Sequence, residues 1–194
     1  MLLDIVKKLN WVDVFVIIAL VRIGYVAFKT GFTIELFKLL GTLFAIYLSM
    51  HYFTVVSDTL IRRGATTEKI PLQFTDFVSF LVLVIAGYLI FVILRSVFYR
   101  FIKMEAAPYL QKWGGLVLGI FRAFLCVGLI MFMLVVSSFE YFKNSVKESY
   151  TGKNFFKIAP ATYSWIWNNV SSKFMNNEKF NNTILEIQDD FGQK

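Results

Sequence analysis

The sequence predicts an all-α membrane protein with four transmembrane helices in two antiparallel hairpins, followed by an amphipathic or interfacial helical tail. The main observation is a set of four apolar runs, at about residues 11–28, 33–55, 74–99 and 114–139. Each run approaches or exceeds the ~20 residues that a helix needs to cross ~30 Å of hydrocarbon. The runs are longer than the ~10-residue strands of a membrane barrel and lack their alternation of polar and apolar residues, so we predict helices.

The composition supports a membrane location. Hydrophobic residues make up 57% of the chain and charged residues 17%, and the mean hydropathy is +0.62. A soluble domain usually carries about 25% charged residues. The net charge of +7 does not come from a basic stripe with interleaved aromatics, as in a nucleic-acid site, because many of the cations lie in short connections. We therefore expect the lipid bilayer and anionic lipid head groups as partners, and no nucleic acid.

The connections between the runs define the hairpins. The first run begins at Trp11, an aromatic residue that favours the membrane interface. Lys7-Lys8 precede it, as in a signal peptide, but no small-residue cleavage site follows, so this helix is expected to be retained. The turn at 29–32 is short enough to join the first two runs as an antiparallel hairpin. A basic loop at 100–112 joins the third and fourth.

The chain after the fourth run has a different character. Residues 1–140 are expected to form the transmembrane domain and residues 141–194 a polar tail. An amphipathic helix is predicted at about 160–175, because apolar residues recur there at spacings of three and four: Tyr163, Ile166, Trp167, Val170 and Phe174. Low net hydrophobicity and two tryptophans favour a place in the membrane interface. The alternatives are a helix docked on the end of the bundle and a partner-binding segment.

Charged residues inside the spans are costly in lipid and are typical of internal pairing or of function. Towards the 29–32 turn and the 100–112 loop they form a layer: Arg22, Glu35, Lys38, Arg95 and Arg122. At 1.5 Å per residue, Arg22 and Glu35 lie within ~5 Å in depth, so they could pair across the hairpin. Lys38 shares a helix face with Glu35. We interpret the layer as neutralisation of Glu35, with the other cations reaching head groups; the alternative is a cationic pocket for an anionic substrate or lipid.

Two further acids lie near helix starts on the side of the termini, Asp13 and Asp76. A carboxylate there complements the helix dipole, an effect of about 0.5 kcal/mol in water. The alternative is a proton relay through Asp13, His51 and Asp76, although His51 is near a helix end and is expected at the interface. The single cysteine, Cys126, lies within the fourth run and is expected to be a packed thiol, without a disulfide or a cysteine metal site.

Glycines occur at defined spacings from two charged residues, Glu35 and Arg122. Gly115 and Gly119 have the GxxxG spacing that lets helices approach closely in lipid, and Gly31 is a further small residue in the first hairpin. The chain resembles the colicin V production protein (CvpA) family of bacterial inner-membrane proteins over about residues 8–165. Three motifs carry this resemblance: Trp11-Val12-Asp13, Gly31-Phe32-Thr33-Ile34-Glu35 and Gly115-x-x-x-Gly119-x-x-Arg122.

The chain also departs from the family pattern. Thr30 stands where the family commonly has Arg or Lys directly before the first glycine. Gln111-Lys112 replaces an expected Asp-Arg pair, and Ala123 replaces the glycine after the arginine. These departures weaken any role assigned to that pair and leave the glycine packing pattern intact.

The resemblance implies a link to colicin V production and toxin biosynthesis, with no established catalytic site. Related proteins carry a periplasmic protease after such a domain, which implies that the termini here are periplasmic. The Lys and Arg count near the membrane favours a cytoplasmic location for the side of the termini, so the two criteria disagree. We follow the resemblance.

The function predicted from the sequence is a non-enzymatic scaffold or accessory protein in toxin production, secretion or envelope maintenance. The alternative is a small oligomeric transporter or channel component that uses the Arg/Glu layer. An enzyme is disfavoured, because the chain has one histidine and lacks a Ser-His-Asp order, HExxH or a P-loop. No cofactor or metal is expected; a membrane-protein partner or a second copy of the chain is compatible with the sequence.

Overall fold

The structure is a computed structural model that describes residues 10–63, 71–101, 108–137, 139–175 and 177–192. Within these ranges the ordered elements are all helices. Four of the basic residues in the Lys and Arg count near the membrane lie outside the described residues: Lys7, Lys8, Lys69 and Lys103.

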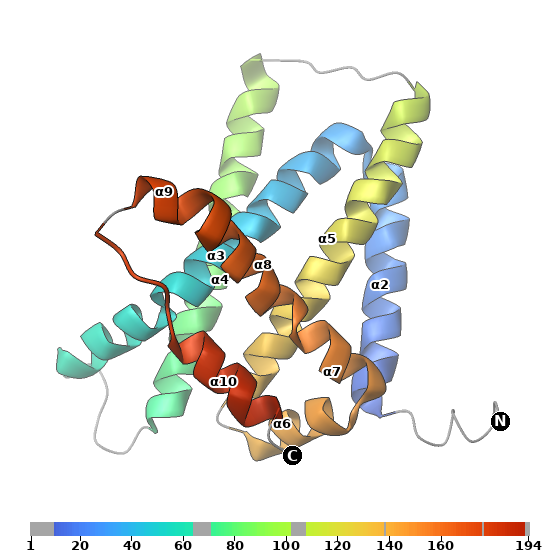
Figure 1. Cartoon of the computed structure of the whole chain (residues 1–194). Helices are drawn as coiled ribbons and strands as arrows, with labels where there is room; N and C mark the ends of the chain where they lie inside the picture. Colours follow the sequence, from blue (N-terminus) through green and yellow to red (C-terminus); the bar gives the residue numbers. More distant parts are fainter. Residues whose placement is uncertain (1–9, 64–70, 102–107, 138, 176, 193–194) are drawn as a thin grey trace.

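Four long helices confirm the predicted spans (Figure 1). They are α2 (Trp11–Thr30), α3 (Phe32–Arg62), α4 (Leu72–Phe101) and α5 (Pro108–Val136). Each is long and apolar enough to cross a membrane. Two ends differ from the prediction by more than three residues, since α3 continues to Arg62 and α5 begins at Pro108, before residue 114. Proline is tolerated in the first turn of a helix, so the polar residues after it can already be helical.

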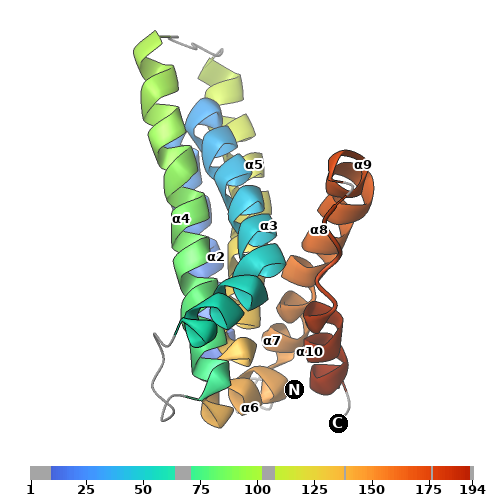
Figure 2. The same ribbon diagram turned by 90° about the vertical axis from the view of Figure 1, so that its left-hand side faces the viewer.

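Consecutive long helices run in opposite directions, as two hairpins require, but the main packing is between the hairpins (Figures 1 and 2). α3 packs along α4 and also against α5, whereas α2 packs mainly against α5. α2 and α3 touch little beyond the turn that joins them. α5 therefore holds α2 to the bundle.

Glycine is required at the turn between α2 and α3. Gly31 has φ 85° and ψ 165°, a backbone conformation that side chains disfavour strongly. The side-chain oxygen of Gln111 accepts a hydrogen bond from the N–H of Phe32 (3.1 Å), one of the N-terminal donors that α3 itself cannot satisfy. Since Gln111 belongs to α5, this bond fixes the turn against that helix.

Glycines also allow a close approach of α5 to the end of α2. A Cβ at Gly115 would lie 2.9 Å from the carbonyl carbon of Gly31 and 3.1 Å from the carbonyl oxygen of Ala27, and one at Gly119 would overlap the Ala27 side chain. The backbones are thus nearly in contact, the geometry by which small residues promote association in lipid.

The α3–α4 interface uses small residues in the same way. A Cβ added to Gly87 would lie 2.9 Å from the Cα of Ala45, and one added to Gly41 would lie 2.9 Å from the Cβ of Phe91. The sequence prediction did not single out Gly87, because an isolated glycine in an apolar run carries no spacing signal.

Among the described residues after α5, the chain forms six short elements: α6 (Glu140–Glu148), α7 (Tyr150–Phe156), α8 (Ile158–Ile166), the π-helical turn η1 (Trp167–Ser171), α9 (Ser172–Phe174) and α10 (Thr183–Gly192). They lie along one side of the half of the bundle that carries the termini (Figure 2). A chain of aromatic contacts joins the tail to the core, from Phe80 to Phe132 (5.5 Å between ring centroids), from Phe132 to Phe156 (5.7 Å) and from Phe156 to Phe191 (4.2 Å). The tail and the long helices therefore share one apolar core.

The segment predicted as an amphipathic helix, residues 160–175, is helical almost throughout, but the residues that it buries near its C-terminal end differ from the prediction. Tyr163 and Trp167 are buried as part of the core, whereas Val170 and Phe174 are exposed, Phe174 to 82%. The wider π-helical turn shifts the buried face by one residue, so that Ser171 follows Tyr163 and Trp167 at spacings of four. The expected stripe was wrong for Val170 and Phe174, because it assumed α-helical periodicity throughout.

We predict that Gly119→Ala will destabilise the protein by about 1–3 kcal/mol, because the new methyl group must displace Ala27 in a packed interface. The matched control is Gly24→Ala in α2, where a Cβ would meet nothing within 4 Å. Unfolding of the purified protein, titrated with SDS in mild detergent, measures both. Equal stability of the Gly119→Ala variant and the unmodified protein would contradict the close contact of α5 with α2.

Candidate functional site

Glu35 places a carboxylate with 0% exposure inside the membrane domain. It lies in the first turn of α3, where the helix dipole favours a negative charge. Burial of an unpaired carboxylate in an apolar interior costs several kcal/mol, so its surroundings must supply positive charge and hydrogen-bond donors.

Three donors from three helices converge on Glu35. The Nε of Arg122 in α5 donates to Oε2 at 2.8 Å. The Nζ of Lys38 in α3 donates to Oε1 at 2.7 Å, and the Oγ1 of Thr30, the last residue of α2, donates to the same oxygen at 2.6 Å. Both carboxylate oxygens are thus satisfied, and the contacts join α2, α3 and α5 at one point.

The glycine pattern of α5 prepares this contact. Arg122 follows Gly119 by three residues, which places the two on one helix face. A Cβ at Gly119 would lie 3.7 Å from Oε2 of Glu35, so the missing side chain lets α5 come close enough for the guanidinium to reach the carboxylate. The two halves of the sequence pattern, Gly31…Glu35 and Gly115…Gly119…Arg122, therefore meet in space.

The remaining cations of the predicted layer lie elsewhere. Arg22 is exposed on α2, so the suggested Arg22–Glu35 pair does not form, and Arg122 pairs with Glu35 instead. Equal depth along two helices does not imply facing sides, and α2 turns Arg22 away from α3. Arg95 of α4 is half-buried and lies beside Lys38 rather than against Glu35.

A second polar contact holds the start of α2 to the tail. Asp13 is fully buried and its Oδ2 accepts the backbone N–H of Asn10 (3.0 Å), as in a capping box. Its Oδ1 accepts the hydroxyl of Ser149 (2.7 Å) and both the backbone N–H (2.8 Å) and hydroxyl (2.6 Å) of Thr151. One carboxylate thus satisfies donors at the beginnings of α2 and α7.

A third polar contact fixes the tail to α3. The buried ring of His51 stacks against Tyr47 and Trp167, with ring centroids 5.3 Å and 5.1 Å away. Its Nδ1 lies 2.9 Å from the hydroxyl of Tyr163, and its Nε2 is hydrogen-bonded to Glu178. His51 is therefore a buried contact between α3 and the tail.

Two groups outside the spans have shifted pKa values in this contact. Burial raises the pKa of Tyr163 to about 12, so its hydroxyl keeps its proton and can donate to His51 while accepting the backbone N–H of Asn181 (3.1 Å). Hydrogen bonds from Tyr52 and His51 lower the pKa of Glu178 below its ordinary 4.5. Ionised Glu178 therefore stabilises tail attachment above pH 4.5, and this contribution is lost as the pH falls through the lowered value.

The three groups of the suggested proton relay are not joined. Asp13 binds the start of α7, His51 binds Tyr163 and Glu178, and Asp76 is half-buried. Asp76 lines a separate cavity of about 290 Å³, together with Gln73, Glu140, Lys143 and Asp190. A relay through these three residues is wrong for this arrangement, because each faces a different part of the tail. Among the described residues, no group of three His, Cys, Asp or Glu side chains could hold a metal ion.

A comparison of the sequence with protein-family models identifies the family of the chain. A family model described as "Colicin V production protein" matches residues 12–160, which is most of the chain. The chain belongs to the colicin V production protein family. The match ends within α8, so it includes the four long helices and the first part of the tail. No curated protein and no solved structure matches the chain.

The structure gives physical roles to two departures from the family pattern. Thr30 stands where a cation was expected, yet its hydroxyl still donates to Glu35. Gln111 stands where an Asp was expected, and its side-chain oxygen still accepts the N–H of Phe32. In both cases a neutral side chain makes the hydrogen bond at the α2–α3 turn.

We predict that Tyr163→Phe will loosen the tail without unfolding the long helices. The lost hydroxyl leaves the buried Nδ1 of His51 and the N–H of Asn181 without that partner, at a cost of about 1–3 kcal/mol. Hydrogen exchange should become faster in α8 and α10 and stay unchanged in the spans. Tyr150→Phe is the control, because that tyrosine is 80% exposed. Unchanged exchange in α8 and α10 of the Tyr163→Phe variant would show that this contact does not hold the tail.

Proposed function

We propose that the protein is a non-enzymatic scaffold of the bacterial inner membrane that assists toxin production and secretion. The observation that carries the proposal is the use of the family motif residues. Gly31, Gly115 and Gly119 provide a close helix contact, and Glu35 and Arg122 pair inside it. The pattern thus builds a fixed joint between helices rather than an open site with free reactive groups. The colicin V production family is not a known enzyme family, which agrees with this role.

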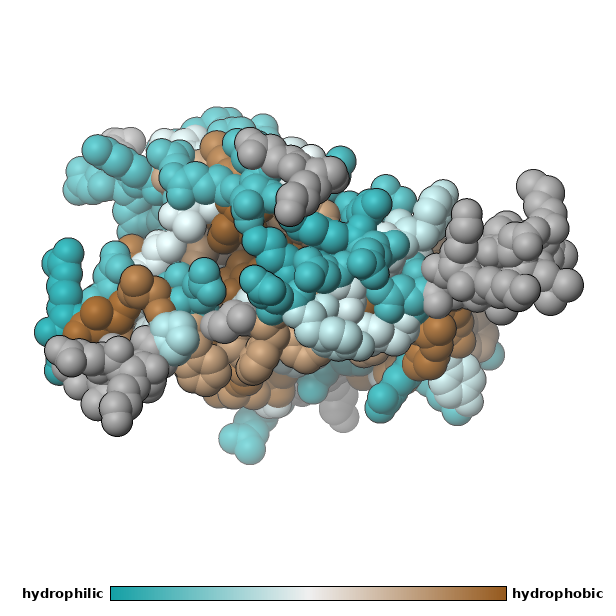
Figure 3. Space-filling model, turned by 90° about the horizontal axis from the view of Figure 1, so that it is seen from below, coloured by the Kyte–Doolittle hydropathy of each residue, from teal (hydrophilic) through white to brown (hydrophobic). Residues whose placement is uncertain are grey.

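A scaffold needs surfaces outside the hydrocarbon that partners can reach. The face at the end of the molecule near the termini presents many hydrophilic side chains, with apolar side chains between them and along one edge (Figure 3). The tail that contributes to this face is held by the Asp13 and His51 contacts, so it has a defined shape. We propose that this face is the part of the protein that a membrane-protein partner or a second copy of the chain contacts.

We further propose that both termini lie in the periplasm, by analogy with the protease-carrying relatives. The opposite end carries cations close to the turn and the loop, including Lys29, Arg100 and Lys112, which would then face the cytoplasm. A C-terminal alkaline phosphatase fusion, active only in the periplasm, tests this orientation. Fluorescence of a C-terminal green fluorescent protein fusion, without activity of the phosphatase fusion, would place the C-terminus in the cytoplasm and contradict the proposal.

The role in toxin production leads to a direct prediction. In a bacterial host that lacks its own family member and carries the colicin V genes, this protein should restore colicin activity in the culture medium. Gly115→Leu should abolish the restoration, because backbone atoms of Ala27 and Gly31 occupy the space of the new side chain. Gly24→Leu, at an open position of α2, is the control and should leave it intact.

Reconstitution of the purified protein in liposomes distinguishes the scaffold from the alternative role, a small transporter or channel component. A scaffold predicts no ion or peptide flux in liposomes at any pH. Flux that Glu35→Gln abolishes and Gly24→Leu preserves would replace the scaffold by a transporter that uses the buried carboxylate. Failure of the unmodified protein to restore colicin activity, despite normal levels in the membrane, would contradict the role in toxin production.

A further inference from the structure

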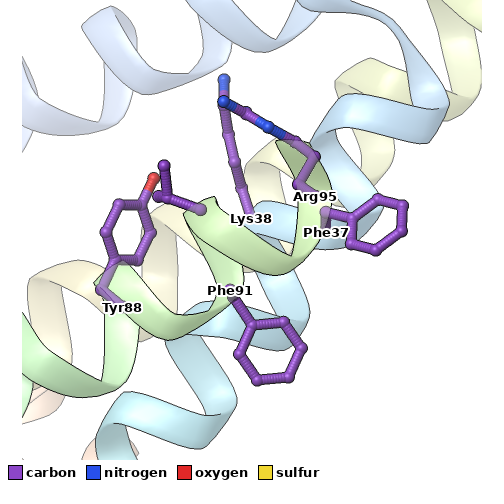
Figure 4. A pocket seen from close by; sticks show the side chains of 6 residues that line it. Phe37, Lys38, Tyr88, Phe91 and Arg95 are labelled. Atoms are coloured by element: carbon purple, nitrogen blue, oxygen red, sulfur yellow. The ribbon is translucent and has the colours of Figure 1, made fainter. Parts of the chain in front are cut away.

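A shallow notch between α3 and α4 faces outward near the end of the bundle opposite the termini. Apolar side chains form its walls, and two cations complete it: Phe37, Lys38, Tyr88, Phe91, Val92 and Arg95. In the close view, the polar ends of Lys38 and Arg95 turn towards one another (Figure 4). Like charges repel, so this arrangement requires a compensating negative charge nearby.

Glu35 does not supply enough negative charge for this group. Its single carboxylate is shared between Lys38 at 2.7 Å and Arg122 at 2.8 Å. Arg95 adds a third positive charge beside Lys38 and makes no ion pair with any residue that the structure describes. The group of three cations and one acid therefore carries a net charge of about +2, in a region of low dielectric where such an excess attracts anions.

The shape of the notch indicates the source of the anion. It encloses essentially no volume for a water-sized molecule, so a ligand must bind at its mouth, from outside the protein. The surface around the mouth is apolar and exposed, with Leu40, Ile93, Leu94 and Val97 between 41% and 63% accessible. In a spanning helix such a surface contacts acyl chains, which places the mouth beside lipid rather than beside bulk water.

We propose that Lys38 and Arg95 bind the phosphate of one anionic phospholipid, whose acyl chains lie along the outer faces of α3 and α4. The planar guanidinium of Arg95 can donate two hydrogen bonds to phosphate oxygens, and the ammonium of Lys38 adds a charge already fixed by Glu35. The aromatic rings of Phe37 and Phe91 border the phosphate. The site depends on the membrane location of the chain and not on its role in toxin production.

Native mass spectrometry of the full-length protein tests the site. The protein is released from detergent with added phosphatidylglycerol or phosphatidylcholine, and bound lipids are counted. The unmodified protein should retain one phosphatidylglycerol in preference to phosphatidylcholine. Arg95→Gln should weaken that binding about tenfold, the effect of losing a charge-assisted hydrogen bond to phosphate. Arg95→Lys should retain more binding than Arg95→Gln, because it keeps the charge and loses the planar pair of donors.

Arg100→Gln is the matched control, since Arg100 lies further along α4 and is exposed outside the notch. The affinity of the Arg100→Gln variant for phosphatidylglycerol should stay within about twofold of that of the unmodified protein. Equal phosphatidylglycerol binding by the Arg95→Gln variant, or no preference for this lipid in the unmodified protein, would overturn the proposal. Displacement of the lipid by millimolar inorganic phosphate would also overturn it, because the site would then bind free anions. The unmodified protein alone can give two of these results, so the test holds even if a variant fails to fold.

Discussion

The need to neutralise one buried carboxylate determines how the membrane half of this protein is built. Glu35 has no access to solvent, and an unpaired charge there would cost several kcal/mol, a large share of the ~5–15 kcal/mol that stabilises most folds. Arg122 must therefore come from α5, and α5 must approach closely enough to bring it. Glycine at positions 115 and 119 makes that approach possible, and the Gly31 turn brings the end of α2 into the same contact.

The other end of the bundle is held in a different way. There Asp13 and His51 connect spans to the tail through hydrogen bonds to Ser149, Thr151 and Tyr163, beside a continuous aromatic core. The two ends of the bundle are thus stabilised by different kinds of contact. One is a tight contact of small residues around an ion pair, and the other joins the long helices to a folded polar segment.

The number and position of the spans could be predicted from the sequence, whereas most of the side-chain contacts could not. Four apolar runs specify four spans, because lipid permits few alternatives, and the GxxxG spacing indicated where helices pack closely. Depth along a helix follows from counting residues, whereas the direction in which a side chain points depends on the rotation of the whole helix. This is why Arg22 was suggested as a partner of Glu35 and Arg122 is found there. The contacts of His51 with Tyr163 and Glu178 span more than 100 residues of sequence, and no local pattern encodes them.

The most direct test of this account is a double-mutant cycle on Glu35→Gln and Arg122→Gln, measured by SDS-driven unfolding in mild detergent. If the ion pair holds α5 to the first hairpin, each single variant should lose about 3 kcal/mol or more, since it leaves a buried charge without its partner. The double variant should then lose less than the sum, with a coupling energy of about 1–3 kcal/mol. Additive losses would contradict the account, because they would show that Glu35 and Arg122 stabilise the protein independently.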